Sequence, residues 1–186
     1  MSPKLLVFTA PSGAGKTTIV RHLLEKFSKL EFSVSATTRA QRPHETDGKD
    51  YYFLSEENFK KKIEQDAFLE WEEVYKGSIY GTLHSEIERI SSEGKIAVFD
   101  IDVKGALNIK QQYGNEAFTI FVKPPSLEVL IERLSKRGTE DETAFQKRVD
   151  RMKYEMSCEK KFDFILLNDE LPLALEQAEQ LVLKFI

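Results

Sequence analysis

The chain has 186 residues, with 27 Lys and Arg against 31 Asp and Glu, which gives a formal net charge of −4. This length predicts one compact domain, and 41% hydrophobic with 31% charged residues argues against wholesale disorder. The acidic balance lacks the footprint of a general nucleic-acid binder, no stretch is apolar enough to span a membrane, and the single cysteine, Cys158, excludes an internal disulfide. No targeting segment is visible, so we expect a cytoplasmic protein with neither nucleic acid nor membrane as a partner.

Apolar strands alternate with helical patterns along most of the chain. Lys4 to Thr9 is a mainly apolar run that predicts a buried strand, and residues 15–28 place apolar side chains at helical spacing. Further strands are expected at 96–99, 117–122 and 163–167, and further helices at 103–113, from 124–126 to about 138, and at 171–185. This alternation predicts a parallel sheet covered by helices on both faces.

Two regions interrupt the alternation. Residues 33–82 are richer in polar and aromatic side chains, and they predict short strands around one helix that Ser55 could cap. Residues 137–161 are strongly charged and predict helix. Both are interpreted as excursions from the sheet that could move over a site.

Ala10 to Thr17 reads A-P-S-G-A-G-K-T and lies between a predicted strand and a predicted helix. This is the context of a phosphate-binding loop, because glycines let successive N–H groups turn toward phosphate oxygens at a helix N-terminus. Lys16 can reach the β- and γ-phosphates of a nucleoside triphosphate, and the Thr17 hydroxyl can hold Mg²⁺. Ala10 replaces the first glycine of the G-x-x-x-x-G-K-[ST] pattern, which the loop tolerates if that residue has a negative φ. The alternative is a glycine-rich turn without a ligand.

A second and more specific pattern lies from Phe32 to Phe53, which reads FSVSATTRAQRPHETDGKDYYF. Its S-V-S-x-T-T-R-x-x-R-x-x-E-x-x-G-x-D-Y-x-F spacing resembles the signature of the guanylate kinase family. His44 departs from the family, which commonly has Gly there. Matching motifs follow in order over nearly the whole chain: F-L-E-W at 68–71, Y-G-T at 80–82, D-I-D-V-K-G at 100–105, P-P-S at 124–126, R-G-T at 137–139, K-R-V at 147–149 and N-D at 168–169.

The resemblance implies an α/β fold of three layers, α/β/α. This would be a P-loop kinase with a parallel core sheet, a mixed β/α GMP-binding insert and a helical lid. In one domain over 1–186, the core would take about 1–32, 83–125 and 162–186, the insert about 33–82 and the lid about 126–161. The implied activity is that of an ATP:GMP phosphotransferase recycling GMP and dGMP, with ATP and GMP as small-molecule partners and Mg²⁺ as cofactor. Monomer and homo-oligomer are both compatible with the sequence. The implied ATP contacts in the loop are Ser12, Gly13, Ala14, Gly15, Lys16, Thr17 and Thr18.

The chemistry of GMP fits the residues that the resemblance assigns to it. Arginines offer forks of N–H donors to a phosphate, and tyrosines donate O–H bonds without adding charge. A carboxylate such as Glu70, among apolar neighbours, can accept N1–H and N2–H of guanine together, which adenine cannot supply. The resemblance implies base contacts by the hydroxyls of Ser35 and Thr82, with help from Asp100. The expected GMP-binding set is Ser35, Arg39, Arg42, Tyr51, Glu70, Tyr80, Thr82 and Asp100.

Catalysis of phosphoryl transfer requires positively charged side chains around the transferred group. The resemblance implies that Arg137 and Arg148 reach the ATP phosphates beside Lys16, and that Arg42 joins them from the GMP side. Arg151 and the nearby lysines are expected to form a solvated helical face.

Two pairs of residues follow predicted strands. Asn168 and Asp169 would contact adenine according to the resemblance, while turn formation is an equal alternative. Asp100 and Asp102 end the strand at 96–99, at the edge where ligands bind in open α/β sheets. We assign Asp100 to GMP and Asp102 to the metal side through water. Capping of the next helix is the alternative for Asp102.

Three other functions compete with the kinase hypothesis. A non-catalytic guanylate-kinase-like module that binds phosphorylated peptides would ordinarily have lost the phosphate loop, which is intact here. A kinase of another phosphorylated metabolite would not need Glu70, Ser35 and Thr82 together. A nucleic-acid-dependent ATPase is disfavoured by the acidic charge balance.

Overall fold

The computed structural model describes residues 4–75, 77–135 and 142–186. Within these ranges, none of the helices is long and apolar enough to cross a lipid bilayer.

The core is a five-stranded sheet in the order β2-β7-β1-β8-β9. All four strand pairs are parallel, as the alternation of apolar strands and helices predicted. The short strand β2 was not predicted, and β7 continues two residues beyond the predicted strand. The strands are β1 (Leu5–Thr9), β2 (Leu30–Phe32), β7 (Ile96–Ile101), β8 (Ala117–Lys123) and β9 (Phe164–Leu167).

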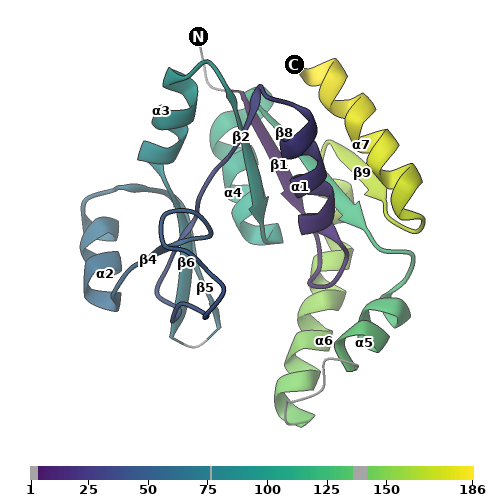
Figure 1. The fold of residues 1–186 in the computed structure, drawn as a ribbon. Coiled ribbons are helices and arrows are strands. Elements are labelled where there is room, and N and C mark those ends of the chain that lie inside the picture. Colours follow the sequence, from purple (N-terminus) through teal and green to yellow (C-terminus); the bar gives the residue numbers. More distant parts are fainter. Residues whose placement is uncertain (1–3, 76, 136–141) are drawn as a thin grey trace.

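Helices cover both faces of this sheet, which confirms the three-layer prediction (Figure 1). Leu6 and Phe8 of β1 pack in the same apolar cluster as α1 (Lys16–Lys26) and α7 (Leu171–Phe185). Leu5 and Val7, which alternate with them, pack with α3 (His84–Ser92) and α4 (Val103–Tyr113). Successive side chains of a strand point to opposite faces, so one apolar strand serves both layers.

A second, four-stranded sheet has the order β4-β3-β6-β5 and mixes parallel with antiparallel pairs. Its own small core includes Phe59 and Phe68, whose rings stack with centroids 4.3 Å apart. Ser55 caps the helix of this region by accepting a 3.1 Å hydrogen bond from the Asn58 N–H, as predicted. The elements are β3 (Ala36–Thr37), β4 (Tyr52–Phe53), α2 (Glu56–Glu64), β5 (Phe68–Tyr75) and β6 (Ser78–Leu83).

Two further helices, α5 (Leu127–Ser135) and α6 (Glu142–Ser157), project from the same end of the core as the second sheet. In Figure 1 the second sheet lies at the lower left and these two helices at the lower right. Val149 and Met152 of α6 join the core cluster of α1 and α7, so this charged helix is anchored by an apolar stripe. Single 3₁₀ turns at η1 (Gly114–Glu116) and η2 (Glu159–Lys161) precede β8 and β9.

Candidate active site

The phosphate-binding loop leads from β1 into α1 through two left-handed glycines. Gly13 and Gly15 both have φ of 89°, a conformation that strains other residues, and Gly15 is the N-cap of α1. Ala10 is buried, and among the described residues other than glycine only Asp66 has a positive φ. The Ala10 and His44 departures are therefore accommodated without backbone strain.

The side chain of Asn168, after β9, supports this loop. It is buried, and its amide donates a 2.7 Å hydrogen bond to the carbonyl of Ala14. A Cβ at Gly15 would overlap the same amide, so the loop and Asn168 fit closely. Asp169 is exposed. The adenine contact of this pair stays a prediction.

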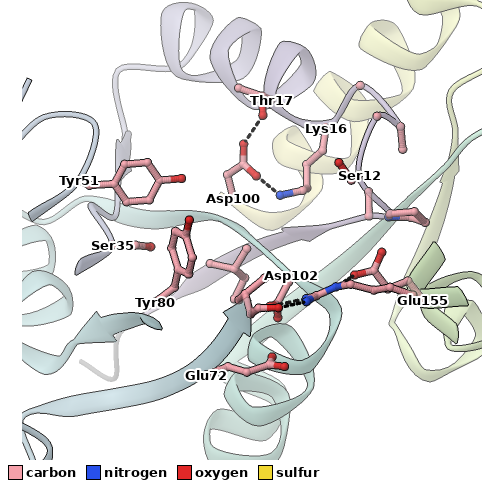
Figure 2. A pocket seen from close by; sticks show the side chains of 18 of the residues that line it. Ser12, Lys16, Thr17, Ser35, Tyr51, Glu72, Tyr80, Asp100, Asp102 and Glu155 are labelled. Atoms are coloured by element: carbon pink, nitrogen blue, oxygen red, sulfur yellow. Dashed lines mark hydrogen bonds and ion pairs between the residues drawn. The ribbon is translucent and has the colours of Figure 1, made fainter. Parts of the chain in front are cut away.

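Lys16, Thr17 and Asp100 meet at the carboxyl end of β7 (Figure 2). The Lys16 ammonium forms an ion pair with Asp100 Oδ1, and the Thr17 hydroxyl donates a 2.7 Å hydrogen bond to Asp100 Oδ2. Burial lowers the pKa of Lys16 to about 8, an effect that the charges of Asp102 and Glu155 oppose. Asp100 is therefore bonded to two residues of the phosphate loop, and its contact with GMP stays a prediction.

Asp102 was expected near the metal, but its carboxylate is bonded to Gly105 and Arg151. Its Oδ1 accepts a 2.8 Å hydrogen bond from the Gly105 N–H and so caps α4, which was the alternative considered from the sequence. Its Oδ2 accepts a 3.1 Å hydrogen bond from Arg151. The carboxylate is thus turned toward α4 and α6, while Thr17 is bonded to Asp100.

One cleft of about 530 Å³ connects the phosphate loop with the second sheet. Figure 2 shows Lys16 and Asp100 on one side of it and Ser35, Tyr51 and Tyr80 on the other. The predicted site residues that line it are Ser12, Gly13, Ala14, Gly15, Lys16, Thr17, Thr18, Ser35, Tyr51, Glu70, Tyr80, Asp100 and Asp102.

Glu70 and Thr82, which the sequence predicts at the base end, are hydrogen-bonded to each other. The Thr82 hydroxyl donates a 2.8 Å hydrogen bond to Glu70 Oε1. Burial raises the pKa of Glu70 to about 7, and the nearby charge of Asp102 acts in the same direction. A Cβ at Gly105 would lie 2.8 Å from Glu70 Oε2 and 3.4 Å from Asp102 Oδ1. Both carboxylates therefore converge over the first turn of α4.

Arg39 contacts two tyrosines that line the cleft, Tyr51 and Tyr80. Its guanidinium makes a double hydrogen bond to Glu45, at 2.7 and 3.0 Å, and donates to the Tyr80 hydroxyl at 3.2 Å. It also lies over the Tyr51 ring, 5.3 Å from the centroid. The hydrogen bond from Arg39 lowers the pKa of Glu45 to about 2. Arg42 is exposed, and its main-chain N–H donates to Glu45 at 2.8 Å.

Arg151 corrects a prediction, because it is not part of a solvated face. Its side chain is 26% exposed and lines the cleft, where it donates to Val74 O, Asp102 and Glu155. Glu72 and Glu155 also line the cleft and were not singled out from the sequence. The four-residue spacing of Arg151 and Glu155 on a helix was the available signal. Arg148 is half-buried on α6 and is not among the cleft-lining residues, and Arg137 lies outside the described residues.

Trp71, the neighbour of Glu70 on β5, is 47% exposed.

The fold and the cleft define a P-loop phosphotransferase whose phosphate loop faces a second polar site on a separate sheet. A sequence model of the guanylate kinase family matches residues 2–184. The guanylate kinases of Chlorobium chlorochromatii (strain CaD3) and Salinibacter ruber (strain DSM 13855 / M31) are each 50% identical to this chain. The alignments cover 100% and 98% of the chain, and 97% and 96% of those proteins.

A crystal structure of guanylate kinase from Anaplasma phagocytophilum superposes with a TM-score of 0.79 at 27% identity. The match covers 98% of this chain and 85% of that one. The chain belongs to the guanylate kinase family. It is a nucleoside monophosphate kinase that phosphorylates GMP with ATP.

Proposed function

We propose that ATP binds at the phosphate loop and GMP at the second sheet, so that the γ-phosphoryl group passes between them inside the cleft that joins the two. The observation that carries this proposal is the continuity of that cleft from Lys16 to Glu70. Catalysis then requires positioning and charge neutralisation, without a covalent intermediate on the protein.

The loop binds the ATP phosphates through main-chain N–H groups at the start of α1, and Lys16 neutralises charge on the transferred group. Oxygen donors at this end, Thr17 and Asp100, fit Mg²⁺, which takes few protein ligands and prefers carboxylate and hydroxyl oxygens. These two residues would hold the ion, directly or through water. Bound Mg²⁺ would supply neutralisation of the phosphate charges.

The base end reads guanine through its hydrogen-bond donors. In this proposal Glu70 accepts from the base, held by Thr82, and Ser35 contributes a hydroxyl from the facing side of the cleft. We place Asp102 at this end as well, since its carboxylate converges with that of Glu70. Pairing a polar base edge in a buried site rejects bases that leave those groups unpaired.

The GMP phosphate lies closer to the reaction. Tyr51 and Tyr80 line the cleft there, and their neutral O–H donors would orient the phosphate without quenching its nucleophilicity. Arg39, already bonded to Tyr80, and Arg42 would add charge. Arg137 and Arg148 are proposed to join Lys16 on the ATP phosphates.

The division into core, insert and lid also remains a proposal, supported by the two separate sheets and by the position of α5 and α6. Closure of insert and lid over both substrates would exclude water. The cytoplasmic location and the absence of nucleic-acid and membrane partners stay predictions.

A coupled ADP-release assay with Mg-ATP tests the proposal, with GMP, AMP, CMP and UMP offered separately. We expect selective turnover of GMP. Lys16→Ala should lower kcat at least about 100-fold, because it removes charge stabilisation of the transferred group. Lys29→Ala, an exposed lysine after α1, is the matched control and should match the wild type. Equal rates with AMP and GMP, or a fully active Lys16→Ala protein, would contradict the proposal.

A further inference from the structure

Three separate parts of the chain meet at the guanidinium of Arg151. From α6 it donates a 3.1 Å hydrogen bond to the main-chain carbonyl of Val74 on β5 and a 3.1 Å hydrogen bond to Asp102 Oδ2 at the start of α4. Its Nε donates to Glu155 Oε1 at 2.9 Å, one turn further along α6. Figure 2 shows the chain of contacts between Asp102 and Glu155.

The surroundings of Arg151 are rich in carboxylates. Asp102 converges with Glu70 over Gly105, and Glu72 and Glu155 line the same cleft. Negative charges gathered in a partly buried site repel one another, so a cation among them helps to keep them ionised and fixed. The Arg151 side chain is 26% exposed, and two of its partners are carboxylates.

The geometry of the contacts selects arginine. Three acceptors on three elements are reached by the fixed, planar fork of one guanidinium, from Nε, Nη1 and Nη2. A lysine ammonium is a compact charge without this fork, so it cannot hold the same three acceptors in the same directions.

We propose that Arg151 is a positioning residue for base recognition: it fixes Asp102 at the base end and holds β5, the strand of Glu70, against it. The inference rests on the proposed placement of Asp102 at the base. Arg151 itself bonds to protein groups and acts on the base through Asp102. With Asp102 oriented and Glu70 in place, Glu70 can accept from N1–H and one hydrogen of the 2-amino group of guanine, and Asp102 from the other hydrogen of that group.

The test compares GMP with IMP, whose base lacks the 2-amino donor of guanine. In Arg151→Met we expect KM for GMP to rise about tenfold while kcat changes less than about twofold, because a charged hydrogen-bond geometry is lost at the base only. The kcat/KM ratio of GMP to IMP should fall, and KM for ATP should stay unchanged. Arg151→Lys should recover part of the ratio.

Asp102→Asn supplies the partner variant, and asparagine preserves the helix cap. If Arg151 acts through Asp102, the double variant should be no less selective than Asp102→Asn alone, so the two effects are non-additive. Lys153→Met, an exposed lysine on the same helix, is the matched control. Thermal melts establish that each variant is folded, and Arg151→Lys provides the comparison if Arg151→Met does not fold.

The outcomes separate two failures. If Asp102→Asn lowers the GMP to IMP ratio while both Arg151 variants keep the wild-type ratio, the inference is overturned and the assignment of Asp102 stands. Additive effects in the double variant overturn it too, because they show an independent structural role. If neither Asp102→Asn nor the Arg151 variants alter the ratio, the placement of Asp102 at the base fails, and the inference fails with it.

Discussion

Asn168 and Ala14 are 154 positions apart in the chain, yet the Asn168 amide donates a 2.7 Å hydrogen bond to the Ala14 carbonyl. The end of the last core strand thereby holds the phosphate loop, whose first residues follow the first strand. Parallel strands place their carboxyl ends at one edge of a sheet, which is how residues from opposite ends of the sequence reach one site.

Asn168→Ala should reduce both stability and ATP binding. The substitution leaves a buried carbonyl without its donor, so we expect the free energy of unfolding to fall by about 1–3 kcal/mol in a urea titration. The loosened loop should also raise KM for ATP more than KM for GMP. Asp169→Ala, at the exposed neighbouring position, is the control. Unchanged stability and unchanged KM for ATP would show that this hydrogen bond does not support the loop.

GMP binding should weaken as the pH falls below about 7. Burial raises the pKa of Glu70 to about 7, so the carboxylate takes up a proton at a pH at which an ordinary glutamate is still ionised. A protonated Glu70 cannot accept two donors from guanine, so KM for GMP should rise on the acid side. In Glu70→Gln the dependence should disappear and KM should be high throughout. Glu73→Gln, exposed on the same strand, should keep the wild-type profile.

Gly105→Ala should separate binding from stability. Gly105 is in α4 without a positive φ, where alanine is ordinarily more stable than glycine by up to about 1 kcal/mol. The added Cβ would nevertheless press on Glu70 Oε2 at 2.8 Å and displace the carboxylate. We expect KM for GMP to rise several-fold with stability equal or slightly higher. Asn108→Ala, at an exposed position of α4, should change neither. A wild-type KM for GMP in Gly105→Ala would mean that Glu70 is free to move.

Glu86 should prove essential for holding the second sheet against the core. This glutamate is 3% exposed, and it accepts from the Val34 N–H at 3.0 Å, from the Tyr52 hydroxyl at 2.8 Å and from Arg89. Glu86→Ala leaves these donors without their acceptor, so the free energy of unfolding should drop by about 3 kcal/mol.

Because Val34 directly precedes Ser35 of the cleft, Glu86→Ala should also raise KM for GMP. Glu88→Ala, exposed on the same helix, is the control for urea unfolding and for kinetics. Stability equal to that of the control would rule out the anchoring role of Glu86.

The elements with strong local signals were predictable from the sequence. The apolar runs of β1 and β8 could only be buried, and α7 occupies the predicted range at 171–185. The helix α3 was not predicted, although Ile87 and Ile90 are spaced for one buried face, and the three-residue strand β2 is too short for a pattern. Its place depends on pairing with β7.

Within the site, the phosphate loop was predictable because all the residues that define it are consecutive in the sequence. The contacts of Asp100 and Asp102 were not predictable, because both residues come from the end of one strand. Which carboxylate meets Lys16 is settled by the β1–β7 register, which pairs Phe8 with Asp100, and by the capping of α4. The contacts of Arg151 depend on how α6 packs against two other elements, which no local pattern encodes.

The exposed Trp71 is an intrinsic fluorescence probe of this protein. It is the single tryptophan among 186 residues, it is 47% exposed, and it is covalently next to Glu70. Indole emission responds to water and to neighbouring charge, so a ligand that buries or shifts β5 should alter the fluorescence of unlabelled protein. Occupancy of the proposed base end beside Glu70 could then be followed on the millisecond scale without a reporter group, separately from turnover.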